Sequence, residues 1–202
     1  MKTLRILLPL TLIGIFTFAS CKKTEVQTPV NGLSELEKTN LLLMREEEKL
    51  ARDVYLYAYD LYGTQIFSNI SGSEQAHMDK ILELLDAYGL TDPVNSAKGV
   101  FSNPELQTLY NALTAKCDLS LEDALLAGAT IEDLDIFDLD EALAATSRAD
   151  ITSAYELLKC GSENHMRAFS KQLNNRGITY TPQFISQSDY DTILSGTNGP
   201  CQ

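Results

Sequence analysis

The sequence predicts an all-α protein whose four long helices form a bundle. Beyond residue 34, apolar residues recur every three or four positions, which is the period of a helix, and no segment shows a convincing two-residue alternation. Helix-start signals stand at Ser34, where Glu37 completes a capping box, and at Asn103, which precedes Pro104. Hydrophobic residues make up 44% of the 202-residue chain, which is enough for one sizeable core.

The individual helices follow from this period and from the glycines and prolines that interrupt it. The first is expected to end at Gly63 and the second before Gly89, with a loop and then a short helix after it. Four long helices pack naturally as a four-helix bundle, here with a short additional helix between helices 2 and 3 and a C-terminal tail. We expect the bundle domain over 34–195, the tail over 196–202, and helices over 35–62, 68–88, 104–116, 120–146, 149–175 and 188–195.

The first 20 residues have the layout of a secretory signal peptide. Lys2 and Arg5 precede an apolar run over 6–18 that is too short to span a bilayer comfortably, and two small residues follow it. The segment 18–21 (FASC) resembles the lipobox of bacterial lipoproteins, in which the cysteine is lipidated. The resemblance implies a lipid on Cys21 and anchorage to a bacterial membrane in the cell envelope, facing the periplasm or the surface. The segment 21–33 is polar, carries Pro29 and shows no periodicity, which predicts a flexible tether. The alternative is ordinary signal cleavage, with Cys21 incidental.

Charge and cysteine content narrow the range of partners. The formal net charge of −12, without a basic patch, argues against nucleic acid as a partner. Cys117, Cys160 and Cys201 match no zinc-binding spacing. In an exported protein these three cysteines allow one disulfide and one free thiol, and the sequence does not select the pair.

Ionisable residues interrupt the apolar stripe of each long helix. Burying such groups without partners is unfavourable, and carboxylates that meet at one buried point repel each other unless a cation lies among them. A metal centre is the simplest explanation. Glu48 is the alternative ligand to Glu47 on the first helix. We predict six metal ligands: Glu47, Glu74, His77, Glu132, Asp135 and His165.

The spacing within the helices indicates the type of centre. Glu74-x-x-His77 places both side chains on one face of one helix. A Glu from each of two helices and a Glu-x-x-His pair from each of two others form the di-metal site of ferritin-like bundles. The fourth long helix departs from this pattern, because Ser162 stands three residues before His165. Asp135 supplies a carboxylate that replaces the missing one, and without it the site would hold a single metal or bind a second one loosely. Oxygen and imidazole ligands favour iron, with manganese or zinc as alternatives.

Four blocks of sequence resemble, in order, the ferritin-like domain-of-unknown-function family 2202. The resemblance covers about residues 34–195 and implies a ferritin-like fold with two metal ions, typical of proteins that handle iron, dioxygen or peroxide. The blocks are residues 45–55 (REEEKLARDVY), 73–79 (SEQAHMD), 131–136 (IEDLDI) and 161–169 (GSENHMRAF).

The sequence therefore favours an exported protein with a di-iron-type centre that acts on iron, dioxygen or peroxide, as a ferroxidase or peroxidase type of oxidoreductase. One alternative is a protein that captures or buffers divalent metal ions without turnover. Another is a helical interaction module without metal, in which the polar core only specifies packing.

Overall fold

The computed structural model describes residues 32–201 and confirms that this part of the chain is all-helical. The predicted signal peptide over 1–20, Cys21 and all but the end of the predicted tether lie outside the described residues. Six helices follow one another: Glu35–Tyr62 (α1), Gln65–Ala87 (α2), Pro104–Cys117 (α3), Leu121–Ala144 (α4), Ala149–Asn174 (α5) and Gln187–Ser195 (α6).

Local signals set most helix ends. The hydroxyl of Ser34 accepts a hydrogen bond from the backbone N–H of Glu37 at 3.1 Å, and the Glu37 carboxylate accepts one from the backbone N–H of Ser34 at 2.8 Å. Gly63 ends α1 in the left-handed conformation, with a φ of 60°, which glycine adopts without steric penalty. Because only Gly63 and Thr64 separate the two helices, α2 begins three residues earlier than expected.

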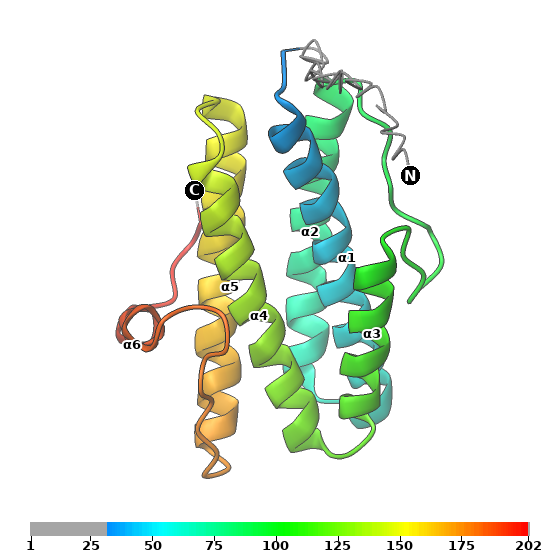
Figure 1. Ribbon diagram of the computed structural model, residues 1–202. Helices are drawn as coiled ribbons and strands as arrows, with labels where there is room; N and C mark the ends of the chain where they lie inside the picture. Colours follow the sequence, from blue (N-terminus) through cyan, green and yellow to red (C-terminus); the bar gives the residue numbers. More distant parts are fainter. Residues whose placement is uncertain (1–31, 202) are drawn as a thin grey trace, which may run out of the picture.

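The four long helices lie side by side in two antiparallel pairs, α1 with α2 and α4 with α5 (Figure 1). Across the pairs, α1 packs on α4 and α2 packs on α5. The connection over 88–103 runs back along the molecule, so that α3 packs against α1 and α4 and the chain enters α4 parallel to α2 (Figure 1). The small α6 packs on α5.

Apolar side chains form two clusters, one toward each end of the long helices. One cluster is centred on Tyr55, Phe67 and Phe169, and the other includes Leu41, Ile81 and Leu158. Near the boundary between the two clusters every long helix carries buried polar side chains: Glu48 on α1, Glu74 and His77 on α2, Glu132 and Asp135 on α4, and Ser162 and His165 on α5. The buried ionisable groups therefore share one layer at the middle of the molecule.

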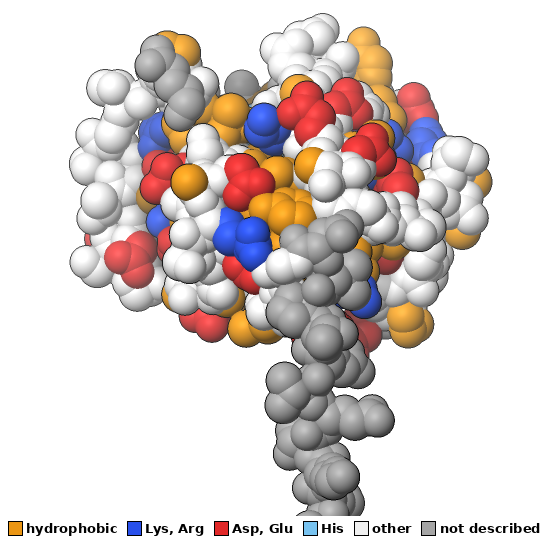
Figure 2. Space-filling view, turned by 90° about the horizontal axis from the view of Figure 1, so that it is seen from above, with side chains coloured by type: hydrophobic (Ala, Val, Ile, Leu, Met, Phe, Trp, Pro, Cys, Tyr) orange, Lys and Arg blue, Asp and Glu red, His pale blue; other side chains and the backbone are white. Residues whose placement is uncertain are grey.

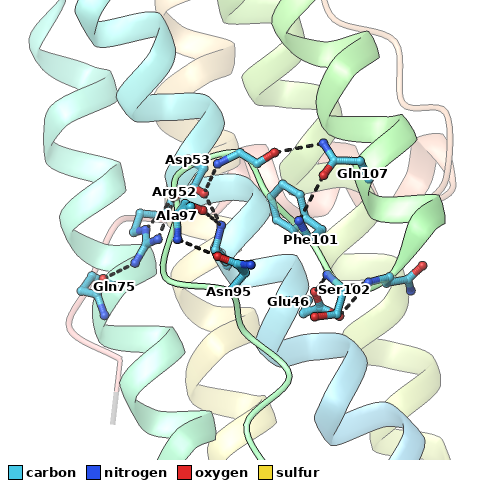
Figure 3. A network of polar contacts seen from close by, with 12 residues as sticks. Glu46, Arg52, Asp53, Gln75, Asn95, Ala97, Phe101, Ser102 and Gln107 are labelled. Atoms are coloured by element: carbon cyan, nitrogen blue, oxygen red, sulfur yellow. Dashed lines mark hydrogen bonds and ion pairs between the residues drawn. The ribbon is translucent and has the colours of Figure 1, made fainter.

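A second group of buried charges fastens the long connection to α1 (Figure 3). We call Arg45, Glu46, Lys49, Arg52 and Asp53 the anchor cluster; Arg52 is half-buried and the other four are buried. The ammonium of Lys49 contacts the Asp53 carboxylate at 2.5 Å and donates to the carbonyl of Ala97 at 3.0 Å. Asp53 also accepts from the backbone N–H of Gly99 at 2.9 Å, and Glu46 accepts from that of Ser102 at 2.6 Å.

The structure pairs Cys160 on α5 with Cys201 in the tail as a disulfide, and Cys117 is a buried free thiol. Acidic and basic side chains lie among apolar ones on the end of the molecule where α1 begins (Figure 2). Among residues 32–201, no helix combines the length and the apolar character that crossing a bilayer requires.

Candidate metal centre

The polar layer contains two groups of three side chains whose potential ligand atoms lie within 4.8 Å of one another. The first group is Glu48, Glu74 and His77, and the second is Glu74, Glu132 and His165. Glu74 belongs to both groups, so its two oxygens face two different imidazoles. All five residues are buried, and together they come from α1, α2, α4 and α5.

The contacts within these groups are close. His77 Nδ1 lies 2.8 Å from Glu74 Oε2 and 3.1 Å from Glu48 Oε2. His165 Nδ1 lies 3.0 Å from Glu74 Oε1 and 3.4 Å from Glu132 Oε2. Donor atoms about 2.1 Å from one metal ion, at right angles to each other, are about 3 Å apart, so this spacing fits atoms that share an ion.

Hydrogen bonds alone do not satisfy the site. One oxygen of Glu48, Oε1 of Glu74 and Nδ1 of His165 are enclosed and make no hydrogen bond of acceptable geometry among the described residues. Enclosed polar atoms without a partner are rare in folded proteins because each carries a desolvation penalty. Oxygen and imidazole atoms left in this way are suitable ligands for a divalent transition-metal ion, so the donor set fits a metal centre.

Neighbouring residues fix the orientation of these ligands. Tyr55 donates its hydroxyl hydrogen to Glu132 Oε1 at 2.5 Å, and His165 Nε2 lies 3.0 Å from the Ser73 hydroxyl. A hydrogen bond at Nε2 leaves Nδ1 of the neutral ring free to bind a metal, which is the usual arrangement around ligating histidines. His77 packs against Gly161, where any Cβ would come within 2.5 Å of the imidazole. The role of Ser73 was missed because a serine beside a glutamate gives no periodic signal.

The pKa shifts of the buried groups show that the site favours positive charge. Burial raises the pKa of Glu48 to about 8, although His77 opposes this shift. Burial would lower the pKa of His165, but the carboxylates of Glu74 and Glu132 raise it to about 10. Burial would raise the pKa of Glu74, yet the two imidazoles lower it well below its usual value. Without metal, the site therefore retains protons on its imidazoles as the available positive charge.

On α1, the structure places Glu48 rather than Glu47 in the metal-ligand groups. The predicted stripe through Glu47 continues to Leu50 and Val54, and it faces α3 and α4. Burial raises the pKa of Glu47 well above its usual value, and Asp138 and Asp135 add to this effect. Because other elements cover α1 on more than one side, two adjacent stripes are buried and the helical period does not distinguish them. The inner stripe is Leu41, Met44, Glu48, Ala51, Tyr55 and Ala58.

Asp135 joins neither group, but it lies beside both. Its Oδ2 accepts a hydrogen bond from the Ser162 hydroxyl at 2.5 Å. Burial and the neighbouring carboxylates of Glu48 and Glu132 raise the pKa of Asp135 well above its usual value. The Asp135 carboxyl group on α4 thus contacts Ser162 on α5, the residue that stands where the Glu-x-x-His pattern would have its glutamate.

Comparison with known proteins places the chain in a family. The model of the uncharacterized protein domain family DUF2202 matches residues 37–197. Uncharacterized protein MJ0754 from Methanocaldococcus jannaschii is 54% identical over 170 residues, which is 84% of this chain and 92% of that protein. A crystal structure of hypothetical protein MJ0754 from Methanococcus jannaschii superposes with a TM-score of 0.82, at 54% identity, over 83% of this chain and 96% of that chain. The chain therefore belongs to the DUF2202 family.

Proposed function

We propose that the protein is a ferritin-like metalloprotein, a four-helix bundle of α1, α2, α4 and α5 that holds two metal ions in its polar layer. The main support is the pair of ligand groups that share Glu74. Glu48 and Glu132 come from α1 and α4, Glu74 and His77 from α2, and His165 from α5. This arrangement matches the ferritin-like di-metal pattern at every position except Ser162. The single long crossover before α4 is also found in that fold.

Charge balance supports two ions rather than one. The polar layer contains four carboxyl groups, those of Glu48, Glu74, Glu132 and Asp135, beside two histidines. When all four carboxyl groups are ionised and both imidazoles are neutral, two divalent cations balance the charge. Two imidazolium protons balance only half of it. We therefore assign Glu74 as the shared ligand and Asp135 as the carboxylate that replaces a glutamate at position 162.

Iron is the metal that this donor set favours, with manganese or zinc as alternatives, because the set combines hard carboxylate oxygens with imidazole nitrogens of intermediate hardness. A bound pair of iron ions would supply redox chemistry, namely the oxidation of iron(II) and the reduction of dioxygen or peroxide. The chain's own contribution is to hold and orient the ligands and to exclude water. Tyr55 orients Glu132, Ser73 orients His165, and the two apolar clusters close the layer on both sides.

Neighbouring glutamates on α1 provide a matched test. Glu48→Gln removes an anionic ligand from the first group, whereas Glu47→Gln changes a carboxyl group outside both groups. After anaerobic loading with iron(II), we expect Glu48→Gln to retain less iron than the wild type and Glu47→Gln to retain the wild-type amount. Equal iron content in both variants, or loss in Glu47→Gln alone, would contradict the assignment. If the wild type binds no transition metal, the metalloprotein proposal is wrong.

Reaction with dioxygen separates an oxidoreductase from a metal buffer. The iron(II)-loaded protein should consume dioxygen or peroxide, and Glu74→Gln, which loses the shared ligand, should not. A wild-type protein that binds iron stoichiometrically without consuming either oxidant would be a capture or buffering protein instead.

We also propose that the protein resides in the cell envelope, anchored through a lipid on Cys21. The Cys160–Cys201 disulfide supports this location, because disulfides persist mainly in oxidising compartments. Expression with the native N-terminus should give a membrane-associated protein whose mass includes a lipid, and Cys21→Ser should release it. An unmodified wild-type N-terminus would refute the anchor.

A further inference from the structure

A small cavity lies beside the polar layer, between α1, α3 and α4. Its volume is about 40 Å³, which corresponds to roughly three water-sized spheres at about 10–15 Å³ each. A space of this size accommodates a diatomic molecule. The apolar wall consists mainly of Leu50, Leu106, Leu109, Leu113, Ile131 and Leu134.

The lining also includes two acidic residues and one exposed aromatic residue. Glu47 and Asp135 are the acidic residues of the lining, and Asp135 adjoins Glu48 and Glu132 of the ligand groups. Phe184, which is 42% exposed, lines the cavity on the solvent side. The cavity therefore has exposed Phe184 in its lining as well as buried Asp135, which lies beside the candidate ligands Glu48 and Glu132.

The segment that carries Phe184 is firmly held. The buried carboxylate of Asp133 accepts hydrogen bonds from the backbone N–H groups of Gln183, Phe184 and Ile185 at 2.5, 3.1 and 3.0 Å. The Tyr180 hydroxyl donates to the same carboxylate at 2.8 Å. Four hydrogen bonds to one buried residue place the aromatic ring over the cavity.

The wall offers little to water. A buried water molecule generally needs two to four polar partners, whereas cavities lined by leucine and isoleucine stay dry and bind apolar gases. The Thr130 hydroxyl already donates to the Leu126 carbonyl at 2.8 Å and accepts from Gln183 at 3.1 Å. Asp135 Oδ2 already accepts from Ser162. One oxygen of Glu47 is enclosed and has no hydrogen-bond partner among the described residues.

We infer that this cavity binds a small apolar molecule of the size of dioxygen and that dioxygen reaches the metal centre through it, past Asp135. The gas site stands on the cavity alone, whereas its use as a route rests on the proposed function. Among diatomic gases, dioxygen is the one that a centre of this type consumes.

Xenon tests the gas site without metal. Crystals of the metal-free protein under xenon pressure should show xenon against Leu106, Leu113 and Ile131. Ala51→Leu, which adds three carbon atoms at the wall, should abolish the xenon density. Leu109→Trp is a second filling variant on another helix. Leu126→Trp is the matched control, because Leu126 is a half-buried leucine outside the cavity wall, and it should retain xenon. Ordered water or no density at this place in the wild type would overturn the gas site.

Steady-state kinetics of the iron(II)-loaded protein test the route. Both filling variants should raise the KM for dioxygen at unchanged iron content, while Leu126→Trp should not. An unchanged KM in filled variants that have lost xenon would overturn the route. Failure of the wild type to bind iron would overturn the proposed function and the route together, but the xenon result would still decide the gas site.

Discussion

Two clusters of buried charge lie side by side on α1, and they are stabilised in different ways. In the anchor cluster, three cations meet three anions when Asp92, which pairs with Arg45 at 2.9 and 3.2 Å, is included. Apart from one nitrogen of Arg45, its side-chain nitrogen and oxygen atoms are not among the enclosed unpartnered atoms. In the polar layer, carboxyl groups outnumber basic groups, and several of their atoms are enclosed without a hydrogen-bond partner.

The difference separates a structural role from a binding role. A nearly complete set of partners lets the anchor cluster hold the connection over 88–103 against α1. An incomplete set keeps the polar layer ready for a cation, at the expense of stability while no cation is bound. Residues 45–53 contribute to both clusters, because successive residues on a helix point in directions about 100° apart.

The largest effect is expected from breaking the anchor cluster. Lys49 is fully buried, and Lys49→Met leaves Asp53 without its ammonium partner. Removing one member of a buried pair typically lowers the free energy of unfolding by about 3–5 kcal/mol, and Arg52, which still contacts Asp53, favours the lower end. Urea denaturation measures this loss. Lys80→Met, which breaks an exposed pair with Glu83, is the control and should change stability by less than about 1 kcal/mol. Similar losses of stability in Lys49→Met and Lys80→Met would contradict the structural role of the anchor cluster.

Metal addition should act on the polar layer alone. An ion that binds only the folded protein stabilises it by about 2.7 kcal/mol at a free concentration 100 times its Kd. Anaerobic iron(II) should therefore raise the melting temperature of the wild type and of Lys49→Met, but not that of Glu74→Gln. A chelator should reverse the change. Equal stabilisation of Glu74→Gln would show that the metal binds elsewhere.

Replacing an aspartate by asparagine should change the stability of the metal-free protein in opposite directions in the two clusters. Asp135→Asn removes an excess carboxyl group while it keeps an acceptor for Ser162, so we expect the metal-free protein to gain about 0.5–2 kcal/mol of stability and to bind less iron. Asp53→Asn removes a required anion and should destabilise the protein. Chemical denaturation of both metal-free variants provides the measurement. Destabilisation by both substitutions would mean that Asp135 is structural.

The smallest effect on stability, counted per pH unit, is expected from a change of pH. The pKa of Glu48 is raised from 4.5 to about 8 and that of His165 from 6.5 to about 10, so the folded metal-free protein binds more protons than the unfolded chain over these ranges. Its stability should fall as pH rises from 4.5 to about 10, by at most about 1.4 kcal/mol per pH unit for each proton released. Bound metal replaces these protons, so saturation with metal should reverse the slope. A metal-free protein whose stability rises across neutral pH would contradict these pKa shifts.

Much of the candidate ligand set follows from helical spacing. Glu74 and His77 lie one turn apart, and the stripes of α4 and α5 brought Glu132 and His165 to the predicted depth. The choice between Glu47 and Glu48 did not follow, because α1 is buried on two adjacent faces. The contact of Asp135 with Ser162 joins two helices, and no pattern along one helix reports which side chain of the other it meets.

The amino-acid sequence by itself determined the six helices, their main caps and the polar layer across the long helices. Capping boxes, glycine termini and the helical period act over a few residues, so they can be read from the chain alone. Only the tertiary structure decided that Glu74 is shared between two groups, that Cys160 pairs with Cys201, and that a mainly apolar cavity adjoins Asp135. These features depend on the distance and rotation between helices, which arise from packing over the whole molecule.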